Sequence, residues 1–127
     1  MNTVTSADVL KVLDSKVSST HGAWNRAVLA YARELVDNIP DSVRFSPDAV
    51  SETLLLGASS WREFNYNGCS LIYDYDIAER CCSPSEFKRS RGGRRAPNKG
   101  ETWLDVQARA LYQASLLVGE VVNLLSD

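Results

Sequence analysis

The sequence has few of the residues that form most metal and nucleophilic centres, with one histidine and three cysteines in 127 residues. The cysteines, Cys69, Cys81 and Cys82, are odd in number, two of them are adjacent, and no Cys-x-x-Cys spacing occurs. A structural zinc site needs four ligands, and a disulfide needs two side chains that can face each other. We therefore expect no metal site, no disulfide scaffold, and cysteines that remain as buried free thiols.

The sequence also lacks any apolar stretch approaching the roughly 18 consecutive residues that a membrane span requires. Residues 1–8 contain neither the basic region nor the apolar core of a secretory signal. Both absences predict a cytoplasmic protein without a membrane segment. A chain of 127 residues, of which 44% are hydrophobic, is long enough to bury a core as one domain without metal or disulfide.

The single histidine, His21, lies in a Ser/Thr-rich connector beside Gly22. A cysteine becomes a nucleophile when a base lies next to it, and nothing in the spacing of the chain pairs His21 with a cysteine. We therefore expect His21 to be a solvent-facing loop residue. The protein is predicted to be non-enzymatic, with no catalytic residue and no cofactor.

Apolar residues recur at helical spacing through the first half of the chain. They predict helices over about 7–18, from Trp24 to Val36, and from Ser46 to about Leu56. Ser6 is expected to cap the first helix, and Pro47 suits the first position of the third.

The middle of the chain carries signals for both helix and strand. Ser60–Glu63 matches a capping box and predicts a short helix, as does Ser83–Glu86 further on. Asn65–Gly68 has the composition of a turn, and Cys69–Tyr73 fits either a strand or the edge of a helix. A short β-hairpin near 64–73 is therefore one of two interpretations of this region.

The clearest pattern is an uninterrupted helical window over about 102–125, predicted to be the central helix. Within it, four apolar residues recur every seven positions: Leu104, Leu111, Val118 and Leu125. Such a stripe is covered either by other helices or by a second copy of the chain in a homodimer. The chain as a whole predicts a mainly α, single compact domain over 1–127, with five or six helices.

A basic segment, Lys88–Gly100, precedes this last helix and contains no acid. It holds six of the fourteen cationic residues of the chain: Lys88, Arg89, Arg91, Arg94, Arg95 and Lys99. The remainder has eight bases against sixteen acids, so a loop of charge +6 is attached to a body near −8. Its arginines can contact phosphates or an acidic protein face, with Arg94 and Arg95 preferred, or the loop can neutralise the protein's own acids.

A cluster of opposite charge lies before the basic segment, where Asp74, Asp76 and Glu79 are interleaved with tyrosines. These carboxylates can accept an arginine-rich partner or imitate spaced phosphates. Asp74 or Asp76 can also cap a helix that continues through Arg80, and carboxylates are ligands for hard cations. No octahedral set is evident, so we expect no metal here.

Four stretches of the second half resemble uncharacterised small proteins of bacterial conjugative elements and phages: Gly57–Trp61, Cys69–Arg80, Ser83–Glu86 and Glu101–Ala114. The resemblance implies no chemistry. It implies that the gene lies among mobile-element genes, which encode many small inhibitors of restriction and CRISPR nucleases. We therefore expect an inhibitor that occludes a host defence protein or ribonucleoprotein through charged surfaces. The alternative is a nucleic-acid-binding accessory protein for maintenance of the element.

Overall fold

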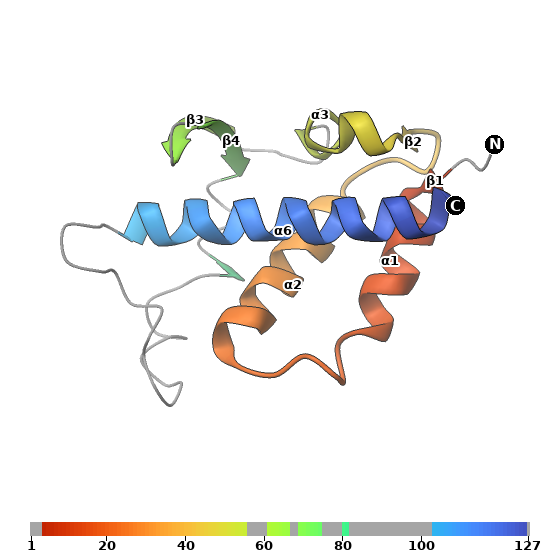
Figure 1. The fold of residues 1–127 in the computed structure, drawn as a ribbon, viewed down its shortest axis with the longest axis horizontal. Coiled ribbons are helices and arrows are strands. Elements are labelled where there is room, and N and C mark those ends of the chain that lie inside the picture. Colours follow the sequence, from red (N-terminus) through yellow and green to blue (C-terminus); the bar gives the residue numbers. More distant parts are fainter. Residues whose placement is uncertain (1–3, 56–60, 67–68, 75–79, 82–102, 127) are drawn as a thin grey trace.

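The computed structural model describes residues 4–55, 61–66, 69–74, 80–81 and 103–126. These residues are mainly helical and are arranged around the long C-terminal helix α6, Trp103–Ser126. Figure 1 shows α6 crossing the molecule, with α1 (Ser6–Ser15) and α2 (Ala23–Asp37) on one side. The helix α3 (Val50–Leu55) and a β-hairpin lie on the other side. The expected central helix over 102–125 is confirmed to within one residue at each end.

The helix α1 is capped by Thr5, and the predicted cap Ser6 is instead its first helical residue. The Thr5 hydroxyl accepts a hydrogen bond from the Asp8 backbone N–H at 3.2 Å, and the Asp8 carboxylate accepts one from the Thr5 N–H at 3.1 Å. This reciprocal pair is a capping box. The two hydrogen bonds with Thr5 hold the pKa of Asp8 below its ordinary value.

Ser6 is buried because its side chain joins α1 to the segment that follows α2. Its hydroxyl is within 3.0 Å of the Ile39 carbonyl oxygen and 2.9 Å of the Asp41 carboxylate. These acceptors lie more than thirty positions away in the chain, which is why local sequence gave the wrong cap. A serine hydroxyl near a helix start can either cap the helix or form a hydrogen bond with a distant group. Because Thr5 caps α1, the Ser6 hydroxyl is available to bond the distant acceptors.

Two strands of two residues each, β1 (Val4–Thr5) and β2 (Arg44–Phe45), pair antiparallel beside α1. Val4 is opposite Phe45, and both side chains are buried in the core. This pair was not anticipated, because two isolated residues show no alternation from which to infer a strand.

The third predicted helix begins where expected, after Ser46, but its first turn is a 3₁₀ turn, Pro47–Ala49. The α-helical part, α3, follows from Val50 to Leu55. Pro47 is at the first position, where its missing N–H is no loss. The Thr53 hydroxyl donates to the Ala49 carbonyl oxygen and so bridges the 3₁₀ turn to α3.

The predicted short helix at Ser60–Glu63 is wrong, because residues from Trp61 onward form a strand. The strands β3 (Trp61–Tyr66) and β4 (Cys69–Asp74) pair antiparallel, from Trp61 opposite Asp74 to Tyr66 opposite Cys69. The β-hairpin interpretation is therefore confirmed, and the hairpin is longer than 64–73. Arg80 and Cys81 are helical, while the helix predicted to start at Ser83 lies outside the described residues. The count of five or six helices stays a prediction.

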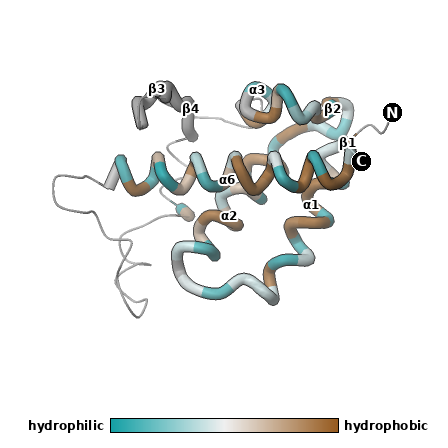
Figure 2. Tube along the Cα trace, in the orientation of Figure 1, coloured by the Kyte–Doolittle hydropathy of each residue, from teal (hydrophilic) through white to brown (hydrophobic). Residues whose placement is uncertain are grey.

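One continuous core joins α1, α2, α3 and α6. Figure 2 shows brown, apolar stretches on α1, α2 and α6 alternating with teal, polar ones, as expected for helices buried on one side. Among the residues whose burial is described, the largest fully buried side chain is Tyr31 of α2, and Leu13 of α1 is also fully buried. Leu111 and Val118, two members of the seven-residue stripe, belong to this core. They are covered within the chain, so neither side chain is available to a second copy.

Candidate binding groove

An open groove of about 550 Å³ lies between α6 and the α1–α2 connector, residues 16–22. Its lining combines an apolar floor with polar walls, a composition that suits a peptide or a small molecule carrying both kinds of group. The floor and one rim come from α2 and α6, and the opposite wall comes from the connector. No motif in the sequence indicates this site.

The connector wall consists of Lys16, Ser19, Thr20 and His21. Its conformation is held by hydrogen bonds within the connector, since the hydroxyls of Ser19 and Thr20 both donate to the Lys16 carbonyl oxygen, at 3.2 and 2.6 Å. Lys16 contributes a positive charge to this wall, and no acid of the connector lines the groove.

The helix α2 starts at the end of the connector. Gly22 precedes it with φ +88°, a left-handed conformation that glycine adopts without strain, and no side chain caps the first turn. The Asn25 amide donates to the His21 carbonyl oxygen at 3.0 Å and so holds the junction between connector and helix. His21 is exposed, as predicted.

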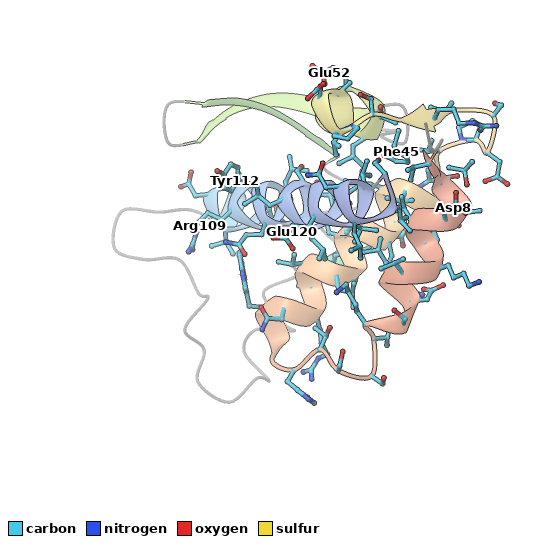
Figure 3. The ribbon with its side chains drawn as sticks, turned by 45° about the vertical axis from the view of Figure 1, so that its right-hand side comes forward. Asp8, Phe45, Glu52, Arg109, Tyr112 and Glu120 are labelled. Atoms are coloured by element: carbon cyan, nitrogen blue, oxygen red, sulfur yellow. The ribbon has the colours of Figure 1, made fainter. Side chains whose placement is uncertain are left out.

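The floor is apolar, and α6 forms the second wall. Val28 and Leu29 of α2 are buried beneath the groove, and Leu117 of α6 is half-buried at its edge. Leu116 exposes 51% of its surface, which makes it the most exposed apolar residue of the lining. Gln113 and Glu120 complete the wall. Figure 3 shows Glu120 on the side of α6 that faces α2, and Tyr112 on the side of the hairpin.

Sequence reasoning missed this groove because its lining comes from residues about a hundred positions apart. The exposure of Leu116 was no signal either, because single exposed apolar residues are ordinary on protein surfaces. The charged residues of the walls, Lys16 and Glu120, form no recognisable motif with their neighbours in the sequence.

The six cations predicted to contact a partner, Lys88 to Lys99, lie outside the described residues, and so do Asp76 and Glu79. Asp74 is the last residue of β4, and because residues 75–79 lie outside the described part of the chain, its suggested role as a helix cap stays a prediction. Only Asp74 of the nine predicted binding residues is described, so the proposed binding surfaces stay predictions. Among the residues it describes, no three His, Cys, Asp or Glu side chains gather closely enough to hold a metal ion.

Cys81 is a free thiol packed against the core and only partly exposed. Burial, with a smaller contribution from the nearby Glu34 carboxylate, raises the pKa of Cys81 from 9.0 to about 11, while Arg80 acts in the opposite direction. Arg80 and Glu34 form an ion pair of 3.3 Å beside it. A thiol with a raised pKa is a poor nucleophile at neutral pH.

We expect Cys81 to react with iodoacetamide at pH 8 about 100-fold more slowly in the folded protein than in urea, because the thiolate is the reactive form. The rate should rise about tenfold per pH unit until pH approaches 11. Mass spectrometry of the Cys69→Ser/Cys82→Ser variant measures this with one remaining thiol. Equal rates in the folded and unfolded states would contradict the assigned burial.

None of the helices in the described ranges is both long and apolar enough to cross a bilayer. In comparisons with known proteins, no family model, no curated protein and no solved structure matches the chain.

Proposed function

We propose that the protein is a non-enzymatic binding protein of a mobile genetic element, which inhibits a host defence nuclease complex of the CRISPR or restriction type by covering one of its surfaces. The observation that carries the proposal is the charge division of the chain. Six cations without an acid lie in Lys88–Gly100, and the remainder has sixteen acids against eight bases. Opposite charges on two parts of one small protein favour association with a partner that is itself charged in patches.

The place of the basic segment in the chain supports this function. The segment ends three residues before α6, the helix against which α1, α2, α3 and the hairpin all pack. A contact made by this segment would be joined to the central helix by the short stretch of chain between Gly100 and Trp103. Asp74, Asp76 and Glu79 are proposed to meet a cationic, nucleic-acid-binding surface of the same partner.

Nuclease assays with purified components test the proposal. We expect the protein to reduce plasmid cleavage by at least one member of a panel of CRISPR effector complexes and restriction enzymes. Replacing the six cations of Lys88–Gly100 by glutamine should restore cleavage. Unreduced cleavage across the panel would count against inhibition.

The second candidate is an accessory protein that binds nucleic acid for maintenance of the element. It predicts binding to arbitrary duplex DNA whose logarithm of affinity falls linearly with the logarithm of salt concentration. Arg94→Ala and Arg95→Ala together should reduce that slope by roughly 2, since each phosphate contact contributes about 0.9. Binding of this kind without nuclease inhibition would favour the accessory role.

A further inference from the structure

We propose that the groove between the α1–α2 connector and α6 binds a peptide segment of the partner protein, in which an apolar side chain enters the floor and an acidic side chain faces Lys16. This inference deepens the proposed function, on which it rests, by naming the chemistry of the partner. The occupant is a protein segment and not a nucleic acid, because the floor is apolar and Lys16 is the one lysine or arginine in the lining.

The apolar part of the occupant follows from Leu116 and the floor beneath it. Leu116 is half exposed although Val28 and Leu29, which line the same groove, are buried. The groove has a volume of about 550 Å³, which is room for a leucine-sized side chain beside Leu116 and Leu117. A partner side chain in contact with Leu116 would remove its exposed apolar surface from water, which is favourable in proportion to the area covered.

The acidic part follows from the charges of the two walls. Lys16 lies on the connector wall, and Glu120 lies on the α6 wall. Within the described part of the chain, neither forms an ion pair, whereas Arg33 pairs with Asp14 at 2.7 Å and Arg80 with Glu34 at 3.3 Å. Opposite, unpaired charges on facing walls orient a peptide, with its carboxylate toward Lys16 and a basic or neutral residue toward Glu120.

Hydrogen bonds within the connector order the wall that carries Lys16. Ser19, Thr20 and Asn25 each donate a hydrogen bond to a backbone carbonyl oxygen of residues 16–21. An ordered wall loses little conformational freedom on binding, which raises affinity for a given set of contacts.

Panning a phage-displayed library of random 12-residue peptides against the full chain tests the proposal. We expect enriched sequences that pair a Leu, Ile, Met or Phe with an Asp or Glu nearby. Synthetic copies of these peptides should shift the backbone amide NMR signals of Thr20, Leu117 and Glu120. The Lys16→Glu variant should bind them at least tenfold more weakly and should enrich basic sequences instead.

Two exposed leucines of α6 provide a matched control. Leu116→Gln removes the apolar rim and should weaken peptide binding about tenfold, while Leu124→Gln, at 67% exposure and outside the groove, should leave it unchanged. Far-UV circular dichroism establishes that both variants are folded.

Three results would overturn the proposal: no enrichment above an unrelated bait, enriched peptides without an acid, or binding that Leu116→Gln leaves intact. The variant with all six cations of Lys88–Gly100 replaced by glutamine separates this proposal from the proposed function. It should lose nuclease inhibition and keep peptide binding. If the protein binds peptides through the groove but inhibits no nuclease, the groove is a peptide-binding site and the proposed function is wrong.

Discussion

Val118→Asp is expected to leave the protein largely unfolded at 25 °C. Val118 is fully buried on the face of α6 that packs into the core, so the substitution places an unpaired carboxylate in an apolar interior. Such a burial costs several kcal/mol, comparable to the roughly 5–15 kcal/mol of total stability of a domain. Far-UV circular dichroism and size-exclusion chromatography measure the loss of helix and the expansion of the chain.

Leu116→Asp is the control, since it introduces the same side chain into the same helix at an exposed position. It should remain folded, with stability lowered by about 1 kcal/mol at most. The pair also separates the two interpretations of the seven-residue stripe. If Val118 formed a homodimer seam, Val118→Asp would give a folded monomer, and that result would contradict the core described here.

Leu13→Ala is expected to lower the free energy of unfolding by about 2–5 kcal/mol. The Leu13 side chain has no exposed surface and lies in the core shared by α1, α2 and α6. Its truncation removes apolar contacts and leaves a cavity that the surrounding helices fill only in part. Urea denaturation followed by circular dichroism gives the difference in free energy.

Leu124→Ala makes the same chemical change where the leucine is 67% exposed. Its effect should stay within about 0.5 kcal/mol, because little apolar surface returns to water and no cavity forms. If the two substitutions cost the same, α1 would not pack as described.

Helix location was predictable wherever a helix buries one side along its whole length. Leu13 in α1, Tyr31 in α2 and Val118 in α6 belong to stripes whose spacing repeats the helical period, and all three are buried. Helix ends were less predictable, as the cap of α1 shows. Thr5 and Ser6 both have capping hydroxyls, and the choice depends on the distant acceptors at Ile39 and Asp41.

The helix predicted from the capping box at Ser60–Glu63 was wrong for a related reason. A capping box describes hydrogen bonds available at a helix start, but the same residues can satisfy their backbone in a sheet. Trp61 is paired with Asp74, and Glu63 with Ile72, so the partner strand supplies a full ladder that a short isolated helix cannot match.

Of the predicted binding residues, the described part of the structure contains Asp74 alone, at the end of a strand. The groove, which the sequence did not indicate, depends on Lys16, Leu116 and Glu120 from opposite ends of the chain. Charge and composition are visible in any sequence. A concave surface is not, since it exists only after distant segments pack.

The amino-acid sequence by itself determined the mainly helical class, the central C-terminal helix and the separation of charge, because periodicity and composition are properties of neighbouring residues. Tertiary structure alone decided the cap of α1, the β1–β2 pair, the internal use of Leu111 and Val118, and the groove. Each of these depends on contacts between residues that are distant in the sequence. The free energy of those contacts comes from burial and from hydrogen bonds, which a local sequence pattern does not show.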